Sequence, residues 1–263
     1  TLGDASAVEH AMARAARVFG RPEWAASARR ALQFIRAQMW RHGRLLATYK
    51  DGRAHLGAYL DDYAFLILAL LELLEAEFRS ADLEFAATLA DVLLEQFDDP
   101  EAGGFFFTAR DHERPIHRPK PGHDHATPAV NGAAAFALNR LAALTGETRY
   151  ADAAERTLRL FYAGMRAQPH GCATLLAALE EGLEPPAIVI VRGAPGALRQ
   201  WSEAMTREFL PRTLVLAIPA GIAGLPPVLD KPAAQGVQAW LCRGAACLPP
   251  LDSVEALRQA CTQ

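Results

Sequence analysis

Residues 63–74, with the sequence YAFLILALLELL, are apolar on nearly every side when they are arranged as a helix. Residues 133–144 (AAAFALNRLAAL) have the same character. A helix without a polar face is typical of a protein interior, because none of its sides meets water. These two stretches predict a mainly α-helical fold with two fully buried helices, around which the other elements are arranged.

Amphipathic helical patterns follow the buried ones after short connections. Residues 24–39, 83–97 and 150–161 each carry one apolar stripe, so the opposite face of each helix meets water. Residues 8–19 and 172–179 are expected to be further inner helices. The alternation of inner and outer helices, with a period of roughly 60–65 residues, predicts antiparallel helical hairpins in a partial α/α toroid at residues 1–184. We count about three and a half of the roughly six hairpins that close such a ring, and therefore expect an incomplete ring in a fragment of a longer chain.

The pattern changes after residue 184, and residues 185–263 are predicted to form a small α/β segment packed on the helices. Residues 187–191 (AIVIV), 213–218 (TLVLAI) and 237–242 (VQAWLC) are strand-like, with helical stretches at about 196–209 and 252–261. A strand-helix-strand order implies a small, partly parallel sheet. Gly193 to Gly196 after the first strand is interpreted as the turn that begins the next helix, and not as a nucleotide site. We expect no cofactor.

Composition excludes several classes of partner. Half of the 263 residues are apolar (51%), which is ample for a core, and the net charge of −3 provides no basic face for nucleic acid. The longest purely apolar run, residues 63–71, is about half as long as a membrane span, and no signal peptide precedes it. The four cysteines are interpreted as reduced thiols, which favours a cytoplasmic protein without membrane contact.

The predicted ligand site lies at the end of the hairpins where the long connections emerge. Residues 41–58 and 98–127 both connect an outer to an inner helix, so they emerge at the same end of the scaffold, and long loops on a rigid scaffold often carry binding sites. Aromatic rings beside polar groups are typical of a pocket for a sugar or another small polar ligand. Residues 103–108 (GGFFFT) are expected to form a short β-hairpin arm over the opening. The expected ligand contacts are His55, Tyr59, Asp61, Tyr63, Phe105, Phe106, Phe107, Arg118, Lys120 and Asn131.

Asp62, Asp124 and His125 are the catalytic candidates, as an acid/base set. Structural explanations compete with these roles. Asp61 is equally explained as a helix N-cap, whereas capping leaves the second acid, Asp62, unexplained. Asn131 begins a buried helix, where its amide needs partners in the protein or in a ligand.

Two further patterns carry alternatives. His123 and His125 flank Asp124, but no third ligand stands at a metal-like spacing, so no metal site is predicted. Cys242 and Cys247 are interpreted either as packing residues or as a redox pair.

Several motifs, taken in order along the chain, resemble the C-terminal two thirds of the YyaL/spermatogenesis-associated thioredoxin-like proteins. This resemblance implies an N-terminal thioredoxin-like domain as a partner in the parent chain. It also implies an α/α toroid of the six-hairpin glycosidase and N-acylglucosamine 2-epimerase kind. His125 and Val130 depart from the family pattern, which has glycines there, and residues 4–7 (DASA) replace a DWNG-like motif. The motifs are residues 51–54 (DGRA), 59–65 (YLDDYAF), 103–108 (GGFFFT) and 118–120 (RPK), Asp124, residues 126–128 (ATP), Asn131, residues 242–243 (CR), Cys247, Pro249 and Pro250.

Two functions therefore remain open from the sequence. The first is a carbohydrate-active enzyme, either a sugar epimerase or a glycosidase, with Asp62 and either Asp124 or His125 as its acid/base pair. The second is a non-catalytic scaffold that binds a small ligand or a peptide for a thioredoxin-like partner domain.

Overall fold

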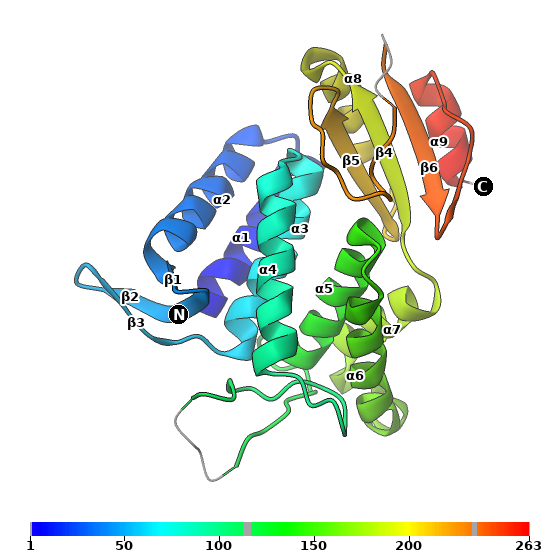
Figure 1. Ribbon diagram of the computed structural model, residues 1–263. Coiled ribbons are helices and arrows are strands. Elements are labelled where there is room, and N and C mark those ends of the chain that lie inside the picture. The colour runs from blue at the N-terminus through cyan, green and yellow to red at the C-terminus, as the bar shows by residue number, and fades with distance from the viewer. Residues whose placement is uncertain (1, 113–116, 233–235, 263) are drawn as a thin grey trace.

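The helical part of the protein contains pairs of consecutive helices that pack on each other, and we call these pairs hairpins. The computed structural model describes residues 2–112, 117–232 and 236–262. Three hairpins follow one another along the chain, and a single helix continues the series after a short 3-10 turn at Pro169–Gly171 (Figure 1). The hairpins are α1 (Leu2–Val18) with α2 (Pro22–Phe34), α3 (Leu60–Ala76) with α4 (Ser80–Gln96), and α5 (Val130–Thr145) with α6 (Thr148–Ala167), and the single helix is α7 (Ala173–Leu183).

An inner row of helices is formed by α1, α3, α5 and α7, each packed against the next. The helices α2, α4 and α6 pack on the outer side, each mainly on the partner in its own hairpin. Both α3 and α5 are buried on nearly all sides, which confirms the prediction from residues 63–74 and 133–144. Gly146 ends α5 in the left-handed conformation (φ 79°), which a glycine adopts without a steric cost. The mainly α-helical class is therefore confirmed.

The first long connection is more ordered than the predicted loop at residues 41–58. After α2, a π-helical turn (Ile35–Met39) leads into a three-stranded antiparallel sheet of β1 (Trp40–Arg41), β2 (Arg44–Lys50) and β3 (Arg53–Gly57). Asp51 and Gly52 join β2 to β3 with positive φ values of 51° and 77°. A two-residue turn of this hand matches the twist of the paired strands, and Asp-Gly is a favoured sequence for it. The prediction of an irregular loop was wrong here, because the Asp51-Gly52 turn pairs the residues on either side of it as strands.

The C-terminal part is a small mixed sheet, as predicted from the strand-helix-strand order. Its strand order is β5-β4-β6-β7, with β4 parallel to β5 and antiparallel to β6. The parallel pair is connected through a helix, which confirms the partly parallel sheet. The elements are β4 (Ala187–Gly193), α8 (Pro195–Thr206), β5 (Thr213–Pro219), β6 (Gln238–Arg243), β7 (Ala246–Cys247) and α9 (Val254–Thr262).

Both faces of this sheet are covered. Ile188 and Ile190 on β4 belong to the core that continues into the helical hairpins, whereas Val189 and Val191 face a second core under α8 and α9. The alternation follows from the two-residue period of a strand. One face of the sheet therefore packs on the inner helices, and the opposite face is closed by its own two helices (Figure 1).

The cysteine prediction was wrong in part. Cys242 and Cys247 form a disulfide, while Cys172 and Cys261 are free thiols. The two bonded residues face each other across the β6–β7 ladder with their Cα atoms 4.0 Å apart. Cysteine spacing alone did not reveal this pairing, because it depends on the turn between the strands. In the described part of the chain, we find no helix with the length and apolar composition needed to cross a membrane.

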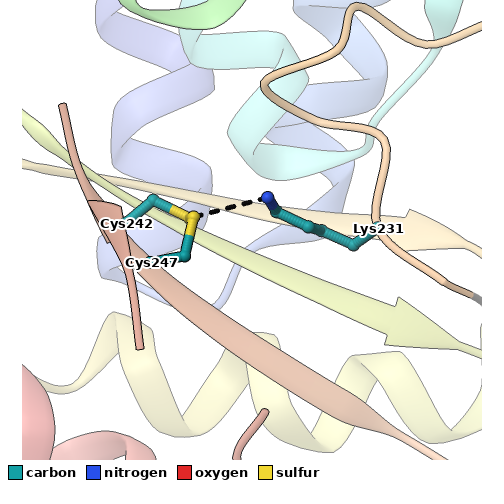
Figure 2. Close-up of a disulfide and its surroundings, with 3 residues drawn as sticks. All are labelled: Lys231, Cys242 and Cys247. Atoms are coloured by element: carbon teal, nitrogen blue, oxygen red, sulfur yellow. Dashed lines mark hydrogen bonds between the residues drawn. A yellow bond between two sulfur atoms is a disulfide. The ribbon is translucent and has the colours of Figure 1, made fainter. Parts of the chain in front are cut away.

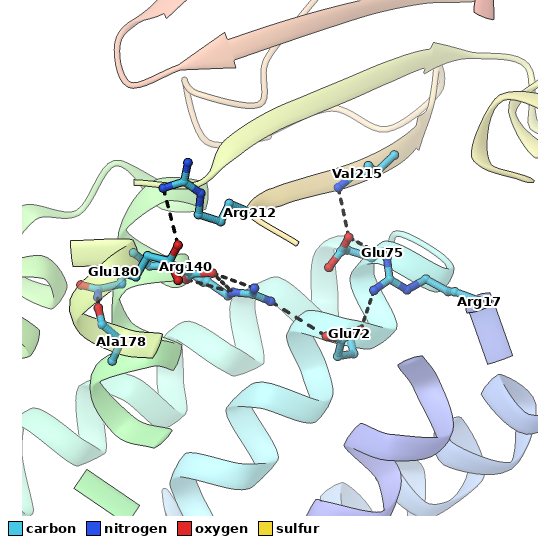
Figure 3. Close-up of polar contacts among 10 residues, drawn as sticks. Arg17, Glu72, Glu75, Arg140, Ala178, Glu180, Arg212 and Val215 are labelled. Atoms are coloured by element: carbon cyan, nitrogen blue, oxygen red, sulfur yellow. Dashed lines mark hydrogen bonds and ion pairs between the residues drawn. The ribbon is translucent and has the colours of Figure 1, made fainter. Parts of the chain in front are cut away.

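A buried network of ion pairs connects the inner helices to the sheet (Figure 3). Arg17 on α1 donates to Glu72 and Glu75 on α3, with both distances 2.6 Å. The same Glu75 carboxylate accepts a hydrogen bond from the backbone N–H of Val215 on β5 (3.1 Å). Arg140 on α5 lies 3.9 Å from Glu72 and pairs with Glu181 on α7 at 2.7 Å. The network thus joins four inner helices and one edge strand.

Burial and charge act in opposite directions on the two glutamates of α3. Burial raises the pKa of Glu75 despite the neighbouring Arg17. Burial also acts to raise the pKa of Glu72, but Arg17, His10 and Arg140 outweigh it and hold this pKa below its usual value. The charged form of Glu72 therefore depends on the surrounding cations.

We expect Arg140→Met to lower the free energy of unfolding by about 3–5 kcal/mol, because it leaves the buried Glu181 carboxylate without its cation. Urea unfolding of the purified chain measures this change. Arg159→Met is the matched control, since Arg159 pairs with Glu155 on the exposed side of α6 (78% and 61% exposed). The control is expected to change the free energy by less than about 1 kcal/mol. Equal effects of the two substitutions would contradict a structural role for the network.

Candidate functional site

Both long connections lie at the same end of the hairpins, opposite the C-terminal sheet (Figure 1). We call this the loop end, and it consists of residues 40–59, 97–112 and 117–129. Residues 113–116 of the second connection lie outside the described residues. The two connections touch, because the N–H of Leu60 donates to the carbonyl of Phe107 (3.1 Å). The beginnings of α3 and α5 are therefore held at one end, as the loop lengths predict.

Asp62 bonds the beginning of α3 to the beginning of α1. Its two carboxylate oxygens accept hydrogen bonds from the N–H of Tyr59 (2.8 Å) and the N–H of Gly3 (2.6 Å). Asp61 accepts a hydrogen bond from the N–H of Asp62 (3.0 Å). Burial raises the pKa of Asp62 to about 7, against the opposing effect of the two N–H donors. Asp62 thus takes part in a capping box with Tyr59, which explains the acid that the sequence left unexplained. The N-cap explanation of Asp61 was wrong, because Tyr59 is the N-cap and Asp61 is the second residue of α3.

Asp124 has a similar connecting role between α5 and α7. It accepts hydrogen bonds from the N–H of Ala129 (2.7 Å), and from the N–H and the hydroxyl of Thr174 (3.0 and 2.5 Å). Burial acts to raise the pKa of Asp124, but these donors outweigh it and lower the pKa. The ionised carboxylate is therefore a bridge between the beginnings of two helices.

Asn131 is fully buried and attaches the second connection to α5. Its side-chain oxygen accepts from the N–H of Phe105 (2.7 Å), and its amide nitrogen donates to the carbonyls of Phe105 (3.0 Å) and Pro121 (2.9 Å). The amide finds its partners within the protein, which is one of the two alternatives that the sequence left open.

The expected β-hairpin arm at residues 103–108 is wrong. A single antiparallel bridge joins Asp98 to Phe105, and Phe105 is 0% exposed in the main core. The backbone N–H and C=O of Phe105 bond to the Asn131 amide, which holds this segment against α5 instead of leaving it as an arm. Phe106 and Phe107 remain partly exposed. The ring of Phe107 stacks on that of Tyr59, with ring centres 5.2 Å apart.

The basic residues of the second connection lie over Phe106. Arg118 and Lys120 approach its ring to 4.1 and 4.6 Å. Lys120 also pairs with Asp99 (2.6 Å) and donates to the carbonyl of Gly103 (2.7 Å). Arg118 donates to the carbonyl of Thr108 (2.5 Å). These contacts fold the connection onto itself.

The remaining candidates are divided between core and surface. Tyr63 is fully buried, and its hydroxyl accepts from the N–H of Leu45 (2.9 Å). His55 is exposed on β3, and His123 and His125 are exposed on either side of Asp124. Among residues 2–112, 117–232 and 236–262, no group of three potential ligands is arranged to hold a metal ion.

The structure thus brings the beginnings of α3 and α5 together. The roles of their polar residues in ligand binding or catalysis stay predictions.

Sequence reasoning missed one buried carboxylate, Glu9 on α1. Its side chain is 3% exposed, and neither carboxylate oxygen has a hydrogen-bond partner in the described structure. Burial raises the pKa of Glu9 to about 8. The signal was weak, because residues 8–19 carry more polar residues than the other inner helices.

No protein-family model matches the chain. Three curated proteins do match parts of it. The chain is similar to spermatogenesis-associated protein 20. It is 31% identical to the Rattus norvegicus protein over 152 residues, which are 57% of this chain and 19% of the rat protein. The Mus musculus protein is 30% identical over the same shares of both chains. The Homo sapiens protein is 34% identical over 122 residues, which are 46% of this chain and 16% of the human protein.

These matches support the family resemblance that the motifs predict. The matched region is about a fifth or less of each relative's length. The activity and partners of a whole protein of this family are therefore matters for proposal.

We expect Glu9→Gln to change how stability depends on pH. The unfolded chain loses the Glu9 proton near the usual pKa of 4.5, but the folded chain keeps it until about pH 8. Stability therefore falls as pH rises through this window, by at most about 1.4 kcal/mol per pH unit for one group. Glu9→Gln removes this decrease, whereas the exposed control Glu84→Gln keeps it. Urea unfolding at pH 5, 6, 7 and 8 measures the slopes, and identical slopes in wild type and Glu9→Gln would contradict the assignment.

Proposed function

We propose that this chain is a non-catalytic scaffold that binds a small polar ligand, such as a sugar, at its loop end. One observation carries the proposal. The carboxylates of Asp62 and Asp124 and the amide of Asn131 all accept hydrogen bonds from backbone N–H groups of this chain. These groups organise the loop end.

An epimerase or a glycosidase needs a pair of groups that are free to exchange protons with the substrate. Protonation of Asp124 would weaken its bonds to Ala129 and Thr174, since a carboxylate accepts more strongly than a carboxylic acid. Asp62 differs in that burial raises its pKa to about 7, but both of its oxygens likewise accept backbone N–H groups. A catalytic cycle through these acids would therefore loosen the beginnings of α3 and α5, which favours the scaffold over the enzyme.

The ligand would meet the partly exposed rings of the loop end. Tyr59 lies between the rings of Phe107 and His112, with ring centres 5.2 Å from each. Aromatic faces next to polar groups suit the apolar and hydroxyl-bearing faces of a sugar ring. Among the predicted polar contacts, His55 is exposed, and Asp61, Arg118 and Lys120 are partly exposed.

The wider architecture belongs to the same proposal. We propose that the three hairpins and α7 are an arc of an α/α toroid in a longer chain. The loop end would then bind a ligand for a thioredoxin-like domain of that chain. We propose the cytoplasm as the location of the protein. The row of inner helices and the similarity to spermatogenesis-associated protein 20 support this arrangement.

A thermal-shift screen against mono- and disaccharides tests the proposal, together with NMR detection of any product. We expect at least one sugar to raise the melting temperature of the wild type by several degrees without being converted. Tyr59→Leu should abolish the shift. Tyr49→Leu is the control, because Tyr49 is an exposed ring on β2 of the first connection that packs against Phe34 of α2. This variant should retain the thermal shift.

Two results would overturn the scaffold. Conversion of a sugar that is lost in Asp62→Asn would establish the enzyme instead. A screen in which no sugar shifts the wild type would remove the sugar-binding role of the loop end.

A further inference from the structure

The disulfide in the C-terminal sheet, drawn in Figure 2, joins a buried cysteine to an exposed one. Cys242 on β6 is 2% exposed and belongs to the core shared with the helical hairpins. Cys247 on β7 is exposed, as is the chain on both sides of it from residue 243 to residue 250. An attacking thiolate from another protein can therefore reach the Cys247 sulfur, while the Cys242 sulfur is shielded.

A lysine lies beside the exposed sulfur. Lys231 places its ammonium nitrogen 3.3 Å from the sulfur of Cys247 (Figure 2). A nearby positive charge favours the thiolate over the thiol, and the thiolate is both the better leaving group and the reactive nucleophile. The cation thus lies at the sulfur that would carry charge when a mixed disulfide at Cys247 is resolved.

The backbone holds the two cysteines together without the covalent bond. Cys242 and Cys247 are paired residues of the antiparallel β6–β7 ladder, five residues apart in the chain. Because the loop they close is so short, the disulfide removes little conformational freedom from the unfolded chain. The two thiols of the reduced form therefore remain adjacent and ready to close again.

The pair also lies at an open edge. In the strand order β5-β4-β6-β7, the short strand β7 is the last strand of the sheet. A partner with an extended segment around its own cysteines can approach such an edge through backbone hydrogen bonds.

From this geometry we propose that Cys242–Cys247 is a redox-active disulfide that exchanges with a dithiol of a partner protein. The partner's first thiolate attacks the Cys247 sulfur, and the bond to Cys242 breaks. Cys242 leaves as a thiolate and takes up a proton. The partner's second thiolate then attacks the partner's own sulfur in the mixed disulfide and releases Cys247 as a thiolate beside Lys231. The partner dithiol is oxidised to a disulfide by two electrons, and this chain is reduced to a dithiol.

The reverse reaction uses the same groups. The Cys247 thiolate attacks a partner disulfide, and Cys242 then resolves the mixed disulfide. The direction depends on the partner's reduction potential. This inference is independent of ligand binding at the loop end.

Single-cysteine variants test the division of roles. Each variant is incubated with oxidised glutathione, and mixed-disulfide formation is followed by mass spectrometry. We expect Cys242→Ser, which leaves Cys247 free, to react at least about tenfold faster than Cys247→Ser at pH 7, because only Cys247 is exposed and beside a cation. Peptide mapping separates this modification from any reaction at Cys172 or Cys261. Equal rates at Cys242 and Cys247 would overturn the proposal.

The role of the lysine is tested in the Cys242→Ser background by the pH profile of Cys247 alkylation with iodoacetamide. Lys231→Gln should move the midpoint to higher pH and slow alkylation several-fold at pH 7, whereas Lys50→Gln, which removes an exposed lysine on β2, should leave the profile unchanged. An unchanged profile in Lys231→Gln would remove the lysine from the mechanism.

Reduction of the wild type completes the test. We expect dithiothreitol, a small dithiol, to reduce Cys242–Cys247 without denaturant and without a change in the far-ultraviolet circular dichroism. A bond that opens only when the chain unfolds would be a structural disulfide and would overturn the inference.

Discussion

Glu72 and Glu75 lie one turn apart on the buried helix α3. The elements that contact them must supply cations or N–H donors to these two carboxylates. A buried carboxylate without a cation is strongly unfavourable, whereas a paired one is tolerated. Arg17 from α1 and Arg140 from α5 supply the cations. Arg140 also forms an ion pair with Glu181 from α7. The Glu75 carboxylate also accepts the N–H of Val215. The ion pairs therefore fix the register of the inner row and the docking of the sheet in one arrangement.

The inner helices are therefore held together by different interactions at their two ends. At the end near the sheet, buried charges fix the helices to one another. At the loop end, the helix beginnings are held by hydrogen bonds from backbone N–H groups to the side chains of Asp62, Asp124 and Asn131. A polar residue at a helix start can bind either the protein itself or a ligand. The hydrogen-bond partners of these three residues lie within this chain, which favours a structural role for them. The surface available to a ligand is then the ring cluster around Tyr59, which these anchors support.

Periodicity predicted the elements whose burial follows from local sequence. The apolar residues 63–74 and 133–144 became α3 and α5, and the strand-helix-strand order after residue 184 became the mixed sheet. The loop end could be predicted from connection lengths alone. The β2–β3 hairpin has a local signal in Asp51-Gly52, a dipeptide that favours a two-residue turn between strands.

Contacts between distant residues were beyond such reasoning. Arg17 and Glu75 are 58 positions apart, and Glu75 and Val215 are 140 apart, so no local pattern links them. Glu72 and Arg140 are charged residues within apolar helices, which is a signal of buried partners that the sequence analysis did not draw on. Phe105 looked like an exposed arm because its burial depends on Asn131, which follows it by 26 residues. The Cys242–Cys247 bond required the turn geometry of β6 and β7.

The amide of Val215 provides the most direct measurement of the central claim. It belongs to β5, an edge strand of the sheet, where a backbone N–H that faces away from the neighbouring strand exchanges rapidly with water unless another group covers it. Native-state hydrogen exchange by NMR should show the Val215 amide protected in the wild type and exchanging much faster in Glu75→Ala, with the amides of the central strand β4 still protected. A Val215 amide that exchanges as fast as a free amide in the wild type would contradict the claim that Glu75 fixes the sheet to the inner helices.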